Sequence, residues 1–240
     1  MFGDLHSICN ISKSYSLEGE DRIALSLLRD IVKTHDSLFY VDIGCNHPET
    51  GNNTKLFYDL GKRGLCVDPL PAMEQAYKRK RPADLFFSGA VGTECLVDFY
   101  IFEDDTASSA DPDTVSRYKD KFRLKKSVTV MQKQLDSILS NFGYTKPVDI
   151  PLLSVDVEGS DLEVVRQVLE QSIHTYHVLI IEDKLVNIDP SFPNNISAIN
   201  ALAHRAGYGM ISKTPLNSVY ILRNSPIFSW IPLSMRYMTT

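Results

Sequence analysis

Two acidic residues stand where short apolar runs end, and each lies beside a residue that breaks a strand. The run from Phe39 to Ile43 contains Asp42 and ends at Gly44, and the run 64–67 ends in Asp68 and a proline. In nucleotide-binding units, the acid that takes the ribose hydroxyls follows the glycine turn by ~20 residues, which matches the separation of Gly44 and Asp68. The spacing therefore predicts a ligand that contains a ribose.

The first of these acids also bears on the rest of the ligand. The segment "DIGCNHPETG" has single glycines at 44 and 51 and lacks the G-x-G-x-x-G pattern of dinucleotide sites. A carboxylate at Asp42 would repel a pyrophosphate and attract an amino group. S-adenosylmethionine has an ammonium, a sulfonium and a ribose but no phosphate. The pattern favours this cofactor, and a nicotinamide-dependent oxidoreductase on a similar fold is the alternative.

Alternating strands and helices must position these acids. Apolar runs predict strands, amphipathic runs predict helices, and the strands are nearly continuous in apolar residues. Such strands indicate a mainly parallel sheet that is covered on both faces, which binds ligands beyond the carboxyl ends of its strands. The strands are expected at 38–44, 64–69, 84–92, 151–159, 177–183, 208–212 and 218–224, and the helices at 20–33, 53–61, 71–80, 134–143, 160–170 and 195–206.

A polar segment interrupts this alternation. Two strand-like runs, 95–102 and 127–132, flank residues 103–123, which are rich in Ser, Asp and Thr. Loops of this length are commonly lids or binding loops. We predict a substrate loop at 103–123 that is mobile without acceptor and carries Ser108 and Ser109 at its tip.

Composition sets limits on the class of protein. The 240 residues suit one α/β domain over 1–240, with an N-terminal helical segment at 1–37. A net charge of −5 argues against a nucleic-acid partner. The four cysteines form no C-x-x-C pair, which favours a reducing compartment, and we expect a cytoplasmic protein. No signal peptide and no transmembrane segment are expected, because no apolar run approaches the ~20 residues that span a bilayer.

Several motifs together resemble a known family. "YSLEGED", "DIGCNHPETGNNTKLFYDLGKRGLCVDP", "SGAVG", "QLDSIL", "LLSVDVEGSDLEVV" and "IIED" occur in the order seen in FkbM-type methyltransferases, over roughly 15–185. The resemblance implies an α/β, Rossmann-like class I methyltransferase fold: a mainly parallel seven-stranded sheet with helices on both faces. It also implies S-adenosylmethionine-dependent O-methylation of a small-molecule or glycan acceptor, often at a sugar hydroxyl. A non-catalytic sugar-binding descendant of the fold is a further alternative. One departure is the pair His47-Pro48, where many members have a glycine.

The resemblance also implies roles for individual residues. Gly44, with Asp42 and Asn46, is expected around the methionine end of the cofactor, and Asp68 at the ribose. Ala90 is expected along the adenine. Glu20 is expected to reach the cofactor from the first helix, or else to act as an acid of the helix's first turn.

Acids at two later strand ends suggest the reaction chemistry. Asp156, Glu182 and Asp183 offer the hard oxygen ligands of Mg²⁺ or Mn²⁺, and a bound cation would lower the pKa of a sugar hydroxyl. Asp156, Glu158 and Glu182 are the candidates for catalysis. Two alternatives stay open: the acids bind the cofactor or sugar hydroxyls directly, or Lys184 pairs with them in place of a cation.

Overall fold

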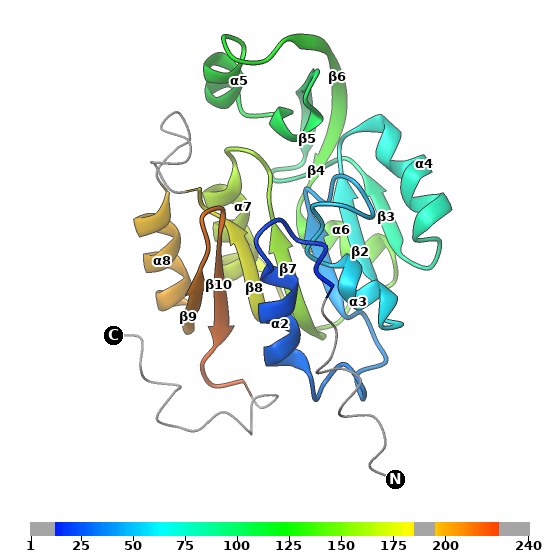
Figure 1. Ribbon diagram of the computed structural model, residues 1–240, viewed down its shortest axis with the longest axis vertical. Coiled ribbons are helices and arrows are strands. Elements are labelled where there is room, and N and C mark those ends of the chain that lie inside the picture. The colour runs from blue at the N-terminus through cyan, green and yellow to red at the C-terminus, as the bar shows by residue number, and fades with distance from the viewer. Residues whose placement is uncertain (1–12, 185–194, 226–240) are drawn as a thin grey trace.

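A seven-stranded sheet forms the centre of the computed structural model, which describes residues 13–184 and 195–225 (Figure 1). The strands β1, β2, β3, β7 and β8 run parallel, and β10 joins β8 and β9 by antiparallel pairing. Their order across the sheet is β3 (Leu85–Ser88), β2 (Gly64–Asp68), β1 (Tyr40–Ile43), β7 (Asp149–Val155), β8 (Thr175–Glu182), β10 (Asn217–Leu222) and β9 (Tyr208–Lys213).

The order of these strands reverses beside β1. Chain order runs outward from β1 to β2 and β3 on one side, and β7 and β8 continue on the other. Ligands of open α/β sheets bind at such a switch point, beyond the carboxyl ends of the strands. The Rossmann-like class I architecture that the sequence predicts is confirmed, including the seven strands and their mainly parallel pairing.

Helices cover both faces of this sheet, as Figure 1 shows. One face packs on α2 (Glu20–Leu28), α3 (Lys55–Asp59) and α4 (Pro71–Lys80), and the other on α6 (Leu135–Asn141), α7 (Asp161–Gln171) and α8 (Ile196–Arg205). Successive strand residues point to opposite faces. In β1, Tyr40 therefore joins the first cluster, whereas Val41 and Ile43 join the second.

A small three-stranded sheet lies above the carboxyl ends of the large one and is called the cap here (Figure 1). It contains β4 (Ala90–Val91), β6 (Leu124–Lys133) and β5 (Cys95–Phe102), in that order. The predicted third strand, 84–92, is thus divided: its first half stays in the large sheet, and its second half pairs with β6.

The expectation of an irregular loop at 103–123 is wrong. This segment contains a short 3-10 helix, Asp105–Ala107, and the helix α5 (Pro112–Tyr118). The carboxylate of Asp111 caps α5 by accepting from the backbone N–H of Thr114 at 2.8 Å. Ser108 and Ser109 are buried and do not form an exposed tip, because their hydroxyls bond Phe102 N and Glu158 O. Mobility of this segment stays a prediction.

None of the described helices combines the length and the apolar character that crossing a bilayer requires. In the N-terminal segment 1–37, the structure shows the helix α2 followed by turns, and residues 1–12 lie outside the described part.

Candidate active site

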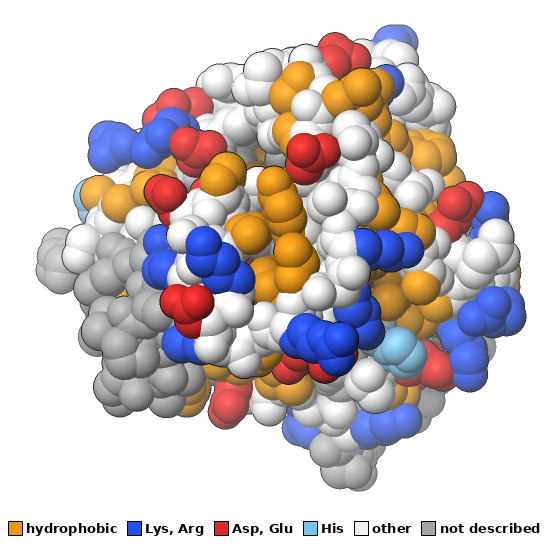
Figure 2. All heavy atoms as spheres, turned by 90° about the horizontal axis from the view of Figure 1, so that it is seen from above, with side chains coloured by type: hydrophobic (Ala, Val, Ile, Leu, Met, Phe, Trp, Pro, Cys, Tyr) orange, Lys and Arg blue, Asp and Glu red, His pale blue; other side chains and the backbone are white. Residues whose placement is uncertain are grey.

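A cavity of about 990 Å³ lies between the cap and the carboxyl ends of the central strands. The loop after β1, the ends of β2, β3, β7 and β8, and the cap segment around Ser108 all contribute to its wall. Figure 2 looks onto the molecule from the cap side: hydrophobic side chains gather near the centre, with both signs of charge scattered around them. Among the residues drawn in colour, this face shows no continuous basic stripe of the kind that binds nucleic acid. The absence of a nucleic-acid partner stays a prediction.

The loop after β1 depends on a glycine. Gly44 has φ +77, and a Cβ at this position would lie 1.6 Å from the carbonyl oxygen of Asp156. Only glycine therefore lets the β1 loop pass so close to the end of β7. Among the residues that the structure describes, two non-glycine residues have positive φ, Asn46 at 39° and Glu158 at 51°, and both line the cavity. Strained backbone of this kind is concentrated at functional sites.

Asp68 lies in the cavity wall at the end of β2, as predicted. One carboxylate oxygen accepts from Asn46 N and the other from Leu70 N, each at 2.8 Å. Burial raises the pKa of Asp68 to about 7. Gly44, Asn46 and Ala90 line the same cavity. The structure thus brings together four of the six residues that the sequence assigns to the cofactor.

The other two acids, Asp42 and Glu20, are buried and are not among the described residues that line the cavity. Asp42 accepts from the Thr54 hydroxyl at 2.7 Å, and burial raises its pKa to about 6. Glu20 accepts from the Thr214 hydroxyl at 2.7 Å and from Asn217 Nδ2 at 2.8 Å. The structure therefore places both acids behind the cavity wall, and direct contact of either with the cofactor stays a prediction.

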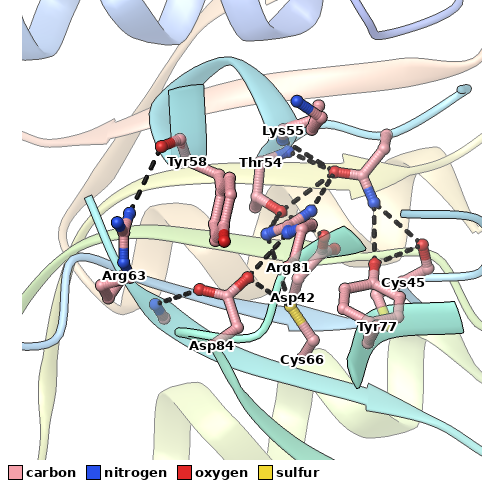
Figure 3. Close-up of polar contacts among 12 residues, drawn as sticks. Asp42, Cys45, Thr54, Lys55, Tyr58, Arg63, Cys66, Tyr77, Arg81 and Asp84 are labelled. Carbon is pink, nitrogen blue, oxygen red and sulfur yellow. Dashed lines mark hydrogen bonds and ion pairs between the residues drawn. The ribbon is translucent and has the colours of Figure 1, made fainter. Parts of the chain in front are cut away.

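A buried network around Arg81, drawn in Figure 3, reaches the loop after β1 through Asn52 and is not predicted from the sequence. The guanidinium donates to Asp84 at 2.7 Å, to Asn52 at 2.9 Å, and to Tyr40 and Thr54 at 3.0 Å. It also lies 5.0 Å from the centre of the Tyr77 ring, within cation–π range. A single arginine in the basic run at the end of α4 gives no sequence signal of this role. Through Asn52, which also donates to the carbonyl oxygen of Cys45 at 3.0 Å, the network fixes the loop after β1.

Acids gather at the ends of β7 and β8. Asp156, Glu158 and Glu182 each place a carboxylate oxygen within 4.8 Å of the others, and we call them the acid group. Lys184 reaches into this group: its ammonium lies 3.0 and 2.9 Å from the two oxygens of Glu158 and 2.7 Å from Glu182 Oε1. Burial raises the pKa of Glu158 to about 8 and that of Glu182 well above its usual range, and the negative charge of Asp156 adds to both shifts.

The expectation that Asp183 belongs to this group is wrong. Its carboxylate bonds Lys213 Nζ at 2.7 Å and the Ser218 hydroxyl at 2.6 Å. Neighbouring residues of a strand point to opposite faces, so Glu182 and Asp183 cannot both reach the cavity. Glu158, which the sequence placed only among the catalytic candidates, takes the third position. Divalent-cation binding by these acids stays a prediction.

Several atoms in this wall lack partners. Among the described residues, Glu182 Oε2 and Asn217 Oδ1 are buried without a hydrogen bond, although both side chains line the cavity. No described side chain bonds the carboxylate of Asp156, which is half-buried in the same wall. Asn217 pairs with Glu182 across β10 and β8, and no local motif in the sequence marks it. Unsatisfied acceptors in a cavity wall indicate a ligand that supplies donors.

A protein-family model matches most of this chain. The family model "Methyltransferase FkbM domain" matches residues 42–210. No curated protein sequence matches the chain. Among solved structures, a TehB-like SAM-dependent methyltransferase from Corynebacterium glutamicum is 12% identical, with 90% of this chain and 93% of that chain covered and a TM-score of 0.41.

A second solved structure is a Burkholderia thailandensis 1,6-didemethyltoxoflavin-N1-methyltransferase with bound 1,6-didemethyltoxoflavin and S-adenosylhomocysteine. It is 11% identical, with 85% of this chain and 77% of that chain covered and a TM-score of 0.37. Similarities this low assign neither a substrate nor a residue role to the present chain.

Proposed function

Because the chain belongs to the FkbM methyltransferase family, whose members use S-adenosylmethionine, we propose that it methylates a hydroxyl oxygen, and specifically a sugar hydroxyl of a glycan, glycolipid or glycosylated small molecule. The observation that carries this proposal is the carboxylate of Asp156. Asp156 lines the cavity, its backbone carbonyl lies against Gly44, and its carboxylate has no hydrogen-bond partner among the described side chains. A carboxylate in this position is a ready acceptor for the proton of an attacking hydroxyl.

The cofactor is held by the residues that meet at the switch point of the sheet. Asp68 accepts hydrogen bonds from the ribose hydroxyls, and the Gly44 loop with Asn46 lies along the methionine part. Ala90, at the start of β4, lies along the adenine. This placement is supported by the shared cavity of these residues and by the position of Asp68 at the carboxyl end of β2.

Methyl transfer then proceeds by in-line displacement. A lone pair of the acceptor oxygen forms the new C–O bond as the bond between the methyl carbon and the sulfonium breaks. The bonding electrons pass to sulfur, so neutral S-adenosylhomocysteine leaves, and the hydroxyl proton passes to Asp156. Positioning supplies most of the rate gain, because a bound hydroxyl aligned with the methyl group no longer has to find it by diffusion.

Asp156 is better placed than the other two acids to act as the base. Both oxygens of Glu158 face the Lys184 ammonium, and Glu182 shares it through Oε1. Their oxygens therefore already accept from an ammonium, whereas no described side chain bonds the carboxylate of Asp156, which stays open to the proton of the hydroxyl. We therefore assign positioning of the acceptor to Glu158 and Glu182 and proton removal to Asp156.

Transfer of a tritiated methyl group to a panel of soluble glycosides tests this proposal, with wild type compared against Asp156→Asn. We expect wild type to methylate at least one glycoside and the variant to lose about 10²–10⁴-fold in kcat, as for removal of a general base. Calorimetry should show that both proteins bind S-adenosylhomocysteine with similar affinity.

Three outcomes oppose the proposal in different ways. No binding of S-adenosylhomocysteine by wild type would contradict the cofactor site itself. Binding without transfer to any hydroxyl would favour a non-catalytic sugar-binding protein. Transfer by Asp156→Asn at the wild-type rate would leave hydroxyl methylation standing and remove Asp156 as the base.

A further inference from the structure

The acid group has the composition of a divalent-cation site. Its three carboxylates come from two neighbouring strand ends, and their oxygens lie within 4.8 Å of one another. Ligands around a cation bound at ~2.0–2.6 Å would have separations of this order. An acid cluster alone is weak evidence for a metal, however, and the group contains a second feature that decides between two kinds of cation.

That feature is the side chain of Lys184. Its ammonium contacts both oxygens of Glu158 and one oxygen of Glu182, at 2.7–3.0 Å, so it already holds two of the three acids. These separations are those of charge-assisted hydrogen bonds. The ammonium thus contributes the positive charge that a bound cation would otherwise supply.

The end of β8 explains how the lysine reaches this position. Side chains of a strand alternate between its faces, so Glu182 and Lys184 share one side, and Asp183 points to the other. Asp183 accordingly pairs with Lys213 at 2.7 Å, away from the acid group. The tripeptide Glu-Asp-Lys therefore delivers one acid and its own counter-ion to the cavity.

A divalent cation and this ammonium are poor neighbours. A metal bound by Asp156 and Glu182 would lie within a few ångströms of the ammonium, and like charges at that separation repel strongly where water is partly excluded. It would also lose Glu158 as a ligand, because Lys184 occupies both of its oxygens.

We propose that the Lys184 ammonium takes the place of a divalent metal in this methyltransferase, so that the acid group does not bind Mg²⁺ or Mn²⁺ until the lysine is removed. The wild-type reaction then needs no metal. Removal of the lysine leaves three carboxylates converging on one vacant position, which is a cation site of ordinary composition.

Manganese binding to the full-length protein tests this directly. The loss of the electron paramagnetic resonance signal of free Mn²⁺ would be titrated for wild type, Lys184→Ala and Lys213→Ala. We expect no binding by wild type at millimolar Mn²⁺, and binding of one Mn²⁺ per chain by Lys184→Ala at least about tenfold tighter. The matched control Lys213→Ala also removes a lysine from an acid, but that acid points away from the cavity, so it should behave as wild type.

Two further variants make the result specific. Lys184→Gln keeps most of the side-chain length without the charge, and it serves if the alanine variant does not fold. Adding Asp156→Asn to Lys184→Ala should abolish the new site. Stoichiometric Mn²⁺ binding by wild type would overturn the proposal, and so would failure of both Lys184 variants to bind the metal. These readouts need no acceptor, so they stand apart from any test of hydroxyl methylation.

Discussion

Arg81 and Lys184 each lie among hydrogen-bond acceptors. The two groups differ in whether the protein itself supplies a donor to every acceptor. Around Arg81, the described side chains satisfy every buried polar atom of the network, and the guanidinium side chain is 0% exposed. Around Lys184, the oxygens Glu182 Oε2 and Asn217 Oδ1 remain without partners among the described residues. One cluster is closed by the protein itself, and the other is left open toward a cavity.

This difference separates a structural cluster from a functional one. Carboxylates and a cation with little exposure occur in both, so raised pKa values or acid content alone would not distinguish them. Unsatisfied acceptors are costly when buried, and a fold keeps them where a ligand supplies the missing donors. The Arg81 network therefore holds the shape of the β1 loop, and we propose that the acid group meets the acceptor.

The largest expected effect comes from breaking the closed cluster. Arg81→Met should lower the free energy of unfolding by about 3–5 kcal/mol, because it leaves Asp84 buried without its charged partner. Lys184→Met should cost clearly less, since Glu158 and Glu182, whose pKa values are raised by burial, can take up a proton instead. Urea denaturation of both variants at pH 7 checks the order, and equal losses would contradict the contrast.

The next effect compares two acids, one in the cavity wall and one behind it. Asp68→Asn should weaken binding of S-adenosylmethionine by about 1.5–3 kcal/mol, because charge-assisted hydrogen bonds to the ribose are lost. Asp42→Asn should leave the affinity within a few fold, since Asp42 bonds Thr54 and does not reach the cavity. Calorimetry measures both. A loss of affinity in Asp42→Asn comparable to that in Asp68→Asn would restore a direct cofactor role for Asp42.

Acidity should act on the same site with a smaller effect. Burial raises the pKa of Asp68 to about 7, and the ribose hydroxyls need its ionised form as acceptor. As the pH falls below 7, the carboxyl must lose a proton before it binds the cofactor, so affinity should fall by up to about tenfold per pH unit. Above pH 8 Asp68 is mostly ionised, so its titration should no longer change the affinity. Calorimetry over a series of pH values measures this dependence, and in Asp68→Asn the affinity should no longer fall steeply below pH 7. If the affinity of the variant falls with the same slope as that of wild type, another residue is responsible for the titration.

The sequence predicts the scaffold better than the site. The parallel sheet, the strand ends at Asp68 and Asp156, and the Gly44 turn follow from apolar runs and their breaks, which are local features. The division of 84–92 between two sheets depends on pairing with β6, and α5 depends on the cap formed by Asp111 within a polar segment. The division of 84–92 and the helix α5 therefore depend on particular contacts, which the average composition of a segment does not predict.

In the site, too, local sequence patterns predict the positions of some side chains, and distant contacts determine the positions of others. Strand alternation could have separated Glu182 from Asp183, because the two are neighbours at a strand end. Asn217 could not be found in this way, since its place beside Glu182 results from the antiparallel pairing of β10 with β8, and its amide is oriented by Glu20 from a distant helix.

The smallest effect is expected at the acid that the sequence placed in the cavity and the structure places elsewhere. Asp183→Asn should leave both the affinity for S-adenosylmethionine and the rate of methyl transfer unchanged, because Asp183 faces Lys213 and Ser218. Its cost to the free energy of unfolding should be modest, about 1 kcal/mol, the typical value of one hydrogen bond. The asparagine can still accept through its amide oxygen, and Lys213 keeps its bonds to the carbonyl oxygens of Asp183 and Thr214 at 3.0 and 2.8 Å. Parallel thermal and kinetic measurements on Asp183→Asn and Glu182→Gln separate the two neighbours. A loss of activity in the Asp183 variant as large as that in the Glu182 variant would return Asp183 to the acid group.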